Sequence, residues 1–292
     1  MQIIVSESHS PSFNLASEQF LLTERPCDVL FFYINDPCVV LGRNQNICAE
    51  INIPYCLSEN IQIVRRLSGG GAVYHDRGNV NFCFISHQAS NPLDYNPLSN
   101  IVSTLSQFGV QSTVGTRKDL YINNKKITGT AIHSSGNHVL FHGTLLYDTD
   151  LEQLETVLAC QHISESKAVK SVRSKVTNIR HETEALKHVG TKGFLDQLAA
   201  KFSKAYHSGI EHFTTAESNR IFGLQAERYE TWEWNWGQSP KMLLKYSLEW
   251  RNQIYHLSLT IEKGLILQIT GDYPEDLATY LSRKRISDLF EL

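Results

Sequence analysis

Hydrophobic residues along the chain fall into short runs separated by turn residues, which predicts a sheet-rich protein with several helices. Strands are expected at 29–34, 38–41, 61–64, 72–74, 81–86, 119–122, 126–131 and 139–146. Helical spacing of apolar residues predicts helices at 98–108, 151–159 and 192–206. A further helix is expected near the start, capped by Ser12 and continuing through Leu22.

These elements mix without the regular alternation of strand and helix that builds a parallel sheet, so the predicted fold class is α+β. The alternation of Trp232, Trp234 and Trp236 predicts one face of a strand packed between lobes. After Gly237-Gln238-Ser239-Pro240, a short meander and a final helix are expected. We therefore predict a main domain over residues 1–230 and a small C-terminal α+β domain over 238–292.

Composition and charge indicate which kinds of partner and which cellular compartment to expect. The chain of 292 residues has 27 Lys and Arg against 30 Asp and Glu, a net charge of -3, which argues against a nucleic-acid partner. No run reaches the ~18 apolar residues of a membrane span. The six cysteines are dispersed, as in a reducing compartment, and the first residues carry no leader pattern. A cytoplasmic protein is expected, and a processed mitochondrial form stays open.

The segment Arg65 to Asn79 concentrates candidate phosphate-binding features. Its three consecutive glycines, Gly69 to Gly71, allow backbone N–H groups to approach an anion, and two arginines precede them. The spacing matches neither a P-loop nor a dinucleotide fingerprint, and a flexible turn is the plain alternative. Ser68 lacks the frame of a nucleophile elbow and is expected to be a turn hydroxyl.

A second group of chemistry-bearing residues spans Lys118 to Ala131. Two strands joined at Asn123-Asn124 would bring Asp119 close to Lys125 and Lys126. Alternation would place Lys126 on one face with Thr128 and Thr130, where a lysine can neutralise a phosphate or polarise a carbonyl. A solvated lysine on an edge strand is the alternative.

The histidines offer little sign of a metal site. His133, His138 and His142 lack an accompanying cysteine or carboxylate pattern, so no protein-bound metal is predicted. No Ser-His-Asp arrangement and no paired carboxylates can be recognised from spacing.

Together these motifs resemble the lipoate-protein ligase A family of the biotin/lipoyl protein ligase group. The family's R-R-x-S-G-G-G-A-V-[FY]-H-D-x-G-N is similar to residues 65–79, its K-[VI]-[ST]-G-[ST]-A to 126–131, and its H-G-T-L-L to 142–146. Further matches are F-N-L-A-x-E, G-R-x-Q-N, S-V-R-S-x-V-T-N and W-E-W-N-x-G-Q-x-P, at residues 13–18, 42–46, 171–178 and 232–240. The resemblance runs from residue 13 to about 240 in the family order.

The resemblance implies a fold and a chemistry. It implies a mixed-sheet catalytic domain of the biotin/lipoyl ligase type with a small C-terminal domain. Such enzymes use ATP and Mg²⁺ to convert lipoate into lipoyl-adenylate, and then transfer the lipoyl group to a lysine of a carrier domain. The implied partners are the lipoyl domains of E2 subunits of 2-oxoacid dehydrogenases and the glycine cleavage H protein. Neither nucleic acid nor membrane is an expected partner, and a monomer is expected.

Motif positions imply roles for individual residues. The resemblance assigns Lys126 to the lipoate carboxylate and the adenylate carbonyl, and Asp119 to the phosphates and Mg²⁺ or to the incoming lysine. It assigns contacts with the nucleotide or the substrate to Arg66, Gly70, Gly71, Ala72, Val73, Tyr74 and His75. It assigns supporting positions next to these residues to Asn79 and His142.

Three alternatives stay open at the level of sequence. A lipoyltransferase would keep the fold and use preformed lipoyl-AMP or a lipoyl-carrier protein. An octanoyltransferase would need a catalytic cysteine, but Cys83 and Cys160 lie outside the matched motifs. A binding module without catalysis would not need Lys126. A local basic surface around Arg65, Arg66, Arg117 and Lys118 is expected to attract an acidic carrier domain.

Overall fold

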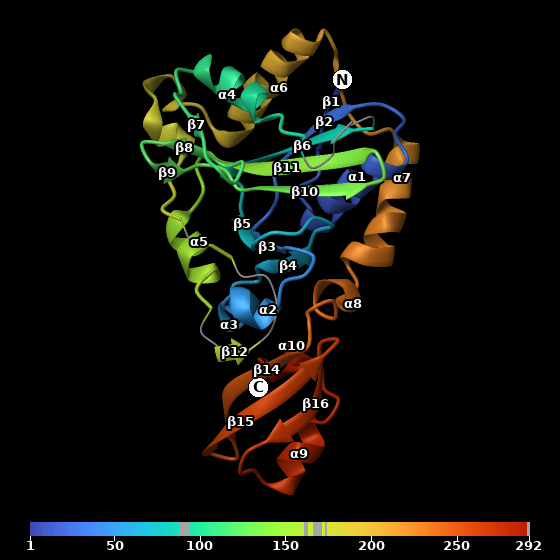
Figure 1. The fold of residues 1–292 in the computed structure, drawn as a ribbon, viewed down its shortest axis with the longest axis vertical. Coiled ribbons are helices and arrows are strands. Elements are labelled where there is room, and N and C mark those ends of the chain that lie inside the picture. The colour runs from blue at the N-terminus through green and yellow to red at the C-terminus, as the bar shows by residue number, and fades with distance from the viewer. Residues whose placement is uncertain (88–93, 161–162, 166–170, 173, 291–292) are drawn as a thin grey trace. The chain divides into compact units, whose positions relative to one another are not determined.

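The computed structural model describes residues 1–87, 94–160, 163–165, 171–172 and 174–290 (Figure 1). They form two compact units, which are described separately. The first comprises Met1–Cys38, His75–Leu154 and Arg173–Tyr229, and the second Val39–Tyr74, Glu155–Val172 and Glu230–Leu292. The chain passes between the units five times, after Cys38, Tyr74, Leu154, Val172 and Tyr229. The domains expected at 1–230 and 238–292 stay a prediction.

A mixed sheet, six-stranded among the described residues, forms the centre of the first unit. Its strand order is β10-β11-β6-β2-β1-β13. Neighbours from β10 to β2 are antiparallel, whereas β2, β1 and β13 are parallel. The strands are β1 (Gln2–Val5), β2 (Val29–Tyr33), β6 (Asn79–Ser86), β10 (Thr130–Ser135), β11 (His138–Leu146) and β13 (Ile210–Glu211). This mixture of directions confirms the predicted α+β class.

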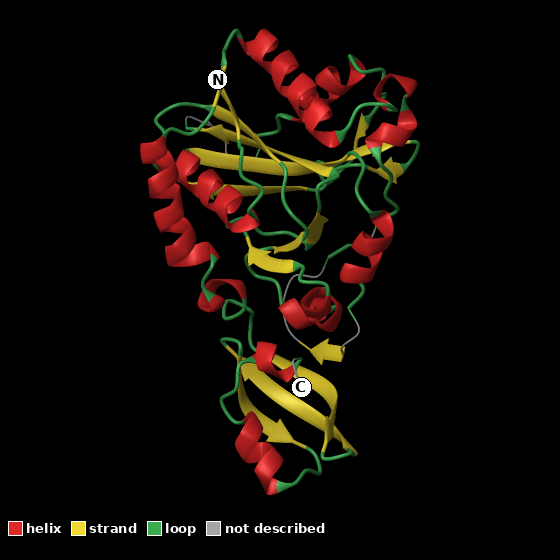
Figure 2. Ribbon diagram, turned by 180° about the vertical axis from the view of Figure 1, so that it is seen from behind, coloured by secondary structure: helices red, strands yellow, loops and turns green. Residues whose placement is uncertain are grey.

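Helices cover both faces of this sheet (Figures 1 and 2). On one face, α4 (Leu98–Ser106) and α6 (Thr191–Tyr206) pack over a core rich in phenylalanine, including Phe82, Phe84 and Phe202. On the other face lies α1 (Pro11–Thr23), with α7 (Thr215–Leu224) and a short π-helix (Gln225–Tyr229) beside it. The α1 face of the sheet carries the polar groups considered below.

The cap of helix α1 is Ser10, two residues earlier than the predicted cap. The Ser10 hydroxyl accepts a hydrogen bond from Phe13 N, and Pro11 occupies the first turn, where its missing N–H costs nothing. The prediction of Ser12 as cap was therefore wrong, because it overlooked the preference of proline for this position. Ser12 is buried within the helix.

A small three-stranded sheet in the first unit carries the lysine motif. Its strands are β7 (Thr113–Val114), β8 (Leu120–Ile122) and β9 (Lys125–Lys126). The predicted strand 126–131 is interrupted, because β9 ends at Lys126 and β10 begins at Thr130. Thr128 is buried and its hydroxyl bonds Thr144 O, so the expected common face of Lys126, Thr128 and Thr130 was wrong. Two 3-10 helices, Ile179–Glu182 and Glu184–Leu186, follow later in the chain.

Among the described residues, two further sheets lie wholly or mostly in the second unit. One has the order β4-β3-β5, with β3 (Cys38–Leu41), β4 (Gln62–Arg65) and β5 (Val73–His75), and carries α2 (Ile47–Glu50) and α3 (Ile53–Ser58) in its connection. The other has the order β12-β14-β15-β16, with β12 (Ile163–Glu165), β14 (Met242–Trp250), β15 (Gln253–Glu262) and β16 (Leu265–Thr270). The remaining helices are α5 (Leu151–Val157), which crosses from the first unit, α8 (Trp232–Asn235), α9 (Glu275–Leu281) and α10 (Ile286–Leu289).

The tryptophan-rich segment is helical, so the predicted strand there was wrong. Thr231 caps α8 by accepting a hydrogen bond from Trp234 N. The Trp232 ring packs against Gly264. A Cβ at position 264 would lie 2.4 Å from a carbon of this ring, so a larger residue does not fit there. The meander after residue 240 and the helix α9 agree with prediction, whereas α10 was not predicted.

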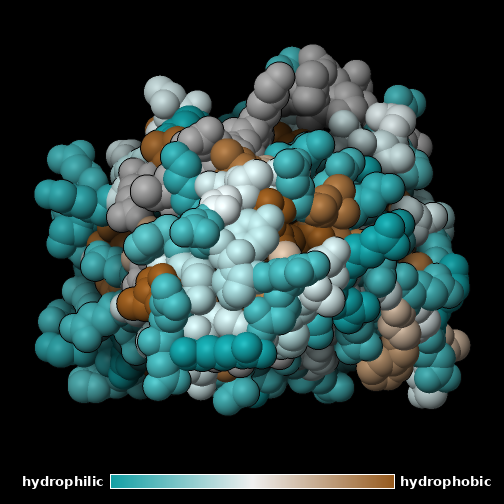
Figure 3. All heavy atoms as spheres, turned by 90° about the horizontal axis from the view of Figure 1, so that it is seen from below, coloured by the Kyte–Doolittle hydropathy of each residue, from teal (hydrophilic) through white to brown (hydrophobic). Residues whose placement is uncertain are grey.

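In the face drawn in Figure 3, hydrophilic side chains predominate and hydrophobic ones form separate small areas. Within the described residues, no helix is both long enough and apolar enough to cross a membrane.

Candidate functional site

Arg66, in the second unit, donates hydrogen bonds to the backbone of the glycine run. Its Nη2 donates to Gly69 O at 2.7 Å and to Gly71 O at 2.8 Å, and its Nη1 donates to Val40 O at 2.9 Å. Its Nε donates to the Ser68 hydroxyl at 2.9 Å. Because the guanidinium holds two carbonyls of the run, it fixes the path of this backbone segment. In this structure Arg66 thus shapes the loop, and a nucleotide contact by Arg66 stays a prediction.

The backbone beyond the glycines is held by a polar cluster within the same unit. Gly70 has φ of +90°, a conformation that glycine adopts without strain. Ala72 N donates to the Ser171 hydroxyl at 2.8 Å. That hydroxyl donates to the buried Glu50 carboxylate and accepts from Gln45 Nε2. These contacts connect the glycine run to the S-V-R-S-x-V-T-N motif, of which Arg173 lies outside the described residues.

Arg65 is fully buried and binds backbone carbonyls. Its guanidinium donates to Gly42 O and Gln45 O, each at 2.9 Å, and to Asn235 O at 2.9 Å. Burial, together with the charge of Arg66, lowers the pKa of Arg65 to about 10. Since Arg65 and Arg66 are both buried, the expected contribution of this pair to a basic surface was wrong. Arg117 is exposed, as predicted.

In the first unit, Lys126 forms an ion pair with Asp119. Lys126 Nζ lies 3.2 Å from Asp119 Oδ2, and the Asp119 side chain is only 2% exposed. Burial alone would raise the pKa of Asp119, but hydrogen bonds from Tyr121 and Lys126 and the Lys126 charge hold it below its ordinary value. The pair therefore contributes to stability at neutral pH, and this contribution is lost as the pH falls through the lowered pKa of Asp119. The predicted proximity of Asp119 and Lys126 is confirmed.

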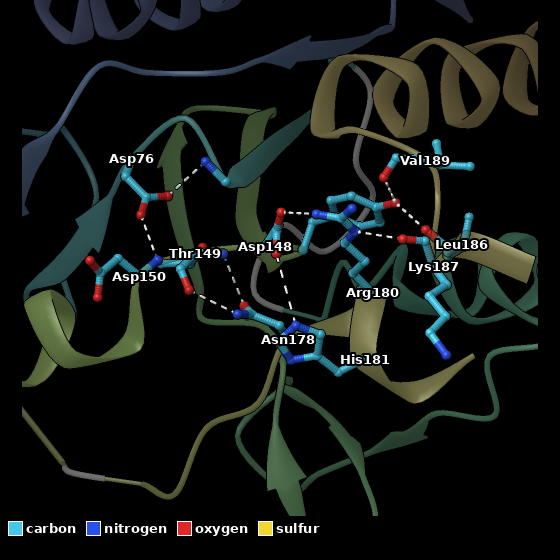
Figure 4. A network of polar contacts seen from close by, with 12 residues as sticks. Asp76, Asp148, Thr149, Asp150, Asn178, Arg180, His181, Leu186, Lys187 and Val189 are labelled. Carbon is cyan, nitrogen blue, oxygen red and sulfur yellow. Dashed lines mark hydrogen bonds and ion pairs between the residues drawn. The ribbon is translucent and has the colours of Figure 1, made fainter. Parts of the chain in front are cut away.

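The backbone of Lys126 is fixed on a second side by residues 175–178. Lys126 N donates to Lys175 O at 2.8 Å, and Thr177 N donates to Lys126 O at 3.1 Å. Asn178 is anchored in turn by exchanging two hydrogen bonds with the Thr149 backbone, as Figure 4 shows. Lys126 is thus held by both a hairpin and a neighbouring segment, which contradicts the reading of a freely solvated edge-strand lysine.

The segment that follows the glycine run, H-D-x-G-N, is built into the first unit. Asp76 accepts hydrogen bonds from Gly78 N and Asp150 N, both at 2.8 Å (Figure 4), and burial raises its pKa. His75 Nδ1 lies 3.0 Å from Asn35 Nδ2 and is buried. Asn79 Nδ2 donates to Asn81, and Asn79 Oδ1 is buried without a partner among the described residues, so the role predicted for Asn79 stays a prediction.

His142 belongs to a buried polar group on the α1 face of the sheet. Its Nδ1 lies 2.8 Å from a carboxylate oxygen of Glu18, and the Tyr33 hydroxyl donates to the same carboxylate at 3.0 Å. Asn14, one turn earlier on α1, donates to Asn35 at 2.8 Å. The supporting role predicted for His142 stays a prediction. Asn14 and Glu18 lie in the F-N-L-A-x-E match at residues 13–18, but no role was predicted for them. Their i,i+4 spacing on a helix that is otherwise buried was the available signal.

The residues assigned by resemblance fall into two sets. Arg66, Gly70, Gly71, Ala72, Val73 and Tyr74 lie in the second unit, and His75, Asn79, Asp119, Lys126 and His142 lie in the first. Within the second unit, contacts connect Arg66 with the glycine run. Within the first, Asp119 contacts Lys126, and His142 contacts Glu18.

The described side chains do not provide a dedicated site for Mg²⁺. In the described part of the chain, no group of three or more His, Cys, Asp and Glu residues could hold a metal ion. Asp119 is already bonded to Lys126 and Tyr121. The described donor set therefore does not fit a Mg²⁺ ion held by protein ligands alone.

Gly78 is required for close backbone packing, and its substitution should destabilise the protein. A Cβ at Gly78 would lie 2.0 Å from Asp148 O, a backbone atom that cannot swing away. We expect Gly78→Ala to lower the free energy of unfolding by about 2–3 kcal/mol, as measured by denaturant unfolding. Gly69→Ala is the matched control, since its Cβ would meet no atom within 4 Å. Equal stabilities of the two variants would contradict this explanation.

Sequence comparison extends over nearly the whole chain. Residues 10–203 match the lipoyl protein ligase A/B catalytic domain family. The chain is similar to lipoate-protein ligase LplJ of Bacillus subtilis, with 33% identity over 275 residues that cover 91% of this chain and 82% of the relative. Both the glycine run and the lysine hairpin lie inside the matched region.

Three solved structures share the fold. The Plasmodium falciparum LipL1 complex with lipoate has a TM-score of 0.70 at 23% identity, covering 97% of this chain and 90% of that one. A bipartite lipoate protein ligase from Thermoplasma acidophilum, described with its E2 lipoyl domain, gives 0.67 at 24%, covering 80% and 95%. Lipoate-protein ligase A bound with ATP gives 0.61 at 24%, covering 80% and 97%.

The mixed sheet and its helices therefore define the fold of lipoate-protein ligases. The match of residues 10–203 to the family and the 33% sequence identity to the Bacillus subtilis relative show that the chain belongs to the lipoyl protein ligase A/B family.

Proposed function

We propose that the protein is an ATP-dependent lipoate-protein ligase that acts through lipoyl-adenylate. In the first step, a lipoate carboxylate oxygen attacks the α-phosphorus of ATP, a new P–O bond forms, and pyrophosphate leaves. In the second step, the neutral amine of a carrier lysine attacks the mixed anhydride, an amide forms, and AMP leaves with release of a proton. The observation that carries the proposal is the family match across residues 10–203, which contains both groups of candidate residues.

For these two steps the protein has to position the reactants and supply positive charge near the reacting carboxylate and phosphates. Lys126, whose side chain is 21% exposed, is assigned to the carboxylate and later to the adenylate carbonyl. The glycine run, shaped by Arg66, is assigned to the nucleotide, with Ala72, Val73 and Tyr74 continuing the binding segment. His75, Asn79 and His142 are assigned to the substrate side of the first unit. Neither step needs a nucleophilic side chain of the protein itself.

The finer assignments extend this proposal. We assign the catalytic function to residues 1–230 and an accessory role to 238–292. The carrier is an E2 lipoyl domain, and the glycine cleavage H protein is a second acceptor. Mg²⁺ enters with ATP. We also propose that the protein is a monomer and acts in the cytoplasm.

The lipoyltransferase alternative is not favoured, since the chain groups with a relative named as a ligase. The experiment is incubation with lipoate, Mg-ATP and inorganic pyrophosphatase, followed by quantification of AMP with and without an E2 lipoyl domain. We expect lipoyl-AMP and pyrophosphate to form with lipoate alone, and free AMP to accumulate only when the acceptor is added, because AMP leaves in the second step. Transfer from preformed lipoyl-AMP without any AMP from ATP would support the transferase instead.

A cysteine-based transferase makes a different prediction for Cys83. Cys83 is fully buried, and burial, with Glu18 nearby, raises the pKa of its thiol, which disfavours a reactive thiolate. We expect Cys83→Ser to retain lipoate-dependent AMP formation within about threefold of wild type. Cys160→Ser should behave likewise. Loss of activity in either folded variant would support a cysteine nucleophile.

A further inference from the structure

We propose that Tyr121 is a positioning residue for Lys126, which acts by holding the Asp119 carboxylate in the orientation that receives the lysine ammonium group. The inference rests on the proposed function, because it concerns the lysine assigned to the lipoate carboxylate. No motif marks Tyr121, and its role follows from the geometry of the hairpin.

The register of the hairpin brings three side chains to one side. Tyr121 of β8 is the direct cross-strand partner of Lys126 of β9. Asp119 comes two residues before Tyr121, so the alternation of an extended chain points both side chains to the same face. The connecting residues Asn123 and Asn124 both have positive φ, +50° and +63°, as a tight two-residue hairpin requires. A slip of one residue would turn Tyr121 away from Lys126.

Tyr121 and Lys126 bind the same carboxylate oxygen. The Tyr121 hydroxyl donates to Asp119 Oδ2 at 3.0 Å, and Lys126 Nζ lies 3.2 Å from that atom. A carboxylate that receives two donors at one oxygen has little freedom to rotate away from the lysine. Burial and the hydrogen bond to Asp119 raise the pKa of Tyr121, so the phenol keeps its proton and remains a donor at neutral pH.

Gly115 leaves the space that this arrangement needs. A Cβ at Gly115 would lie 2.4 Å from Asp119 Oδ1 and 2.6 Å from a ring carbon of Tyr121. Gly115 N also donates to Asp119 O at 2.7 Å, which fixes the backbone of the aspartate. Asp119 is therefore confined by Gly115 on one side and by Tyr121 and Lys126 on the other. Among these, the Tyr121 hydroxyl can be removed by substitution without opening a cavity.

The test begins with Tyr121→Phe, which removes the hydroxyl and keeps the ring. We expect the kcat for lipoate-dependent AMP formation to fall about tenfold, the loss for one hydrogen bond to a charged group, with the KM for ATP unchanged. Tyr255→Phe is the matched control, because the Tyr255 hydroxyl bonds Gln253 in the C-terminal sheet. A kcat for Tyr121→Phe within twofold of wild type would overturn the inference.

A double variant separates positioning from a general loss of structure. If Tyr121 acts through Asp119, Tyr121→Phe should cost little further activity in an Asp119→Asn background, since the two changes remove one interaction. Independent, multiplicative effects would contradict the inference.

A readout without catalysis keeps this inference distinct from the proposed function. A carboxyl-carbon NMR titration should show a higher pKa for Asp119 in Tyr121→Phe than in wild type, since a hydrogen bond to the charged form is lost. The charged groups that bear on this carboxyl are Lys126 and, through Tyr121, Arg117. An unchanged pKa would refute the contact itself. If wild type formed no AMP while the pKa still rose, the proposed function would fail and the contact would stand.

Discussion

Lys126→Ala should reduce lipoate-dependent AMP formation by about a hundredfold or more, the effect of removing a positioned charge from a developing anion. The side chain is held by Asp119 at 3.2 Å and its backbone by Lys175 and Thr177. Because its removal leaves the buried Asp119 carboxylate with the Tyr121 hydroxyl as its side-chain donor, the free energy of unfolding should fall by about 1–3 kcal/mol. Rates of adenylate formation and a thermal melt measure the two effects.

Lys125→Ala provides the control for this variant. Lys125 is adjacent in the sequence but exposed, and its cross-strand partner is Ile122. We expect nearly wild-type activity from it. Full activity in Lys126→Ala would show that the lysine is assigned to the wrong step, and equal losses in both variants would indicate a general effect of charge.

Arg65→Met should cause the largest loss of stability, about 3–5 kcal/mol, or roughly 10 °C in the thermal midpoint. The substitution leaves the carbonyls of Gly42, Gln45 and Asn235 buried without their donor. The Arg65 backbone and side chain also bind the α8 segment, so that segment should loosen first. Denaturant unfolding measures the effect, and proteolysis after residue 230 detects the loosening.

Arg43→Met is the matched control for Arg65→Met. Arg43 lies in the same unit and its side chain is exposed, so its removal should change stability by less than about 0.5 kcal/mol. Partial recovery in Arg65→Lys would agree with a role in donating to carbonyls. A stable Arg65→Met protein would contradict the assignment of Arg65 as a structural group.

Much of the fold could be predicted because local signals and tertiary structure agree. The hairpin at Asn123-Asn124 is an example, since asparagine tolerates the positive φ that the turn requires. The pairing of Asp119 with Lys126 followed from that turn. The predicted meander after residue 240 rested on equally local patterns.

The remaining features depend on contacts between distant parts of the sequence. Trp232, Trp234 and Trp236 alternate as in a strand, yet the Thr231 cap and packing against Gly264 favour a helix. Two adjacent arginines look alike in the sequence, but Arg65 binds residues about 170 positions away while Arg66 binds the neighbouring glycines. The partnership of Glu18 with His142 also spans the sequence, so no local pattern specifies it.

The most direct test of the central claim is the intact mass of an E2 lipoyl domain after incubation with the protein, lipoate and Mg-ATP. The account predicts addition of one lipoyl group, dependent on both ATP and Lys126. A carrier domain that stays unmodified with ATP and lipoate, but is modified when lipoyl-AMP is supplied, would contradict it.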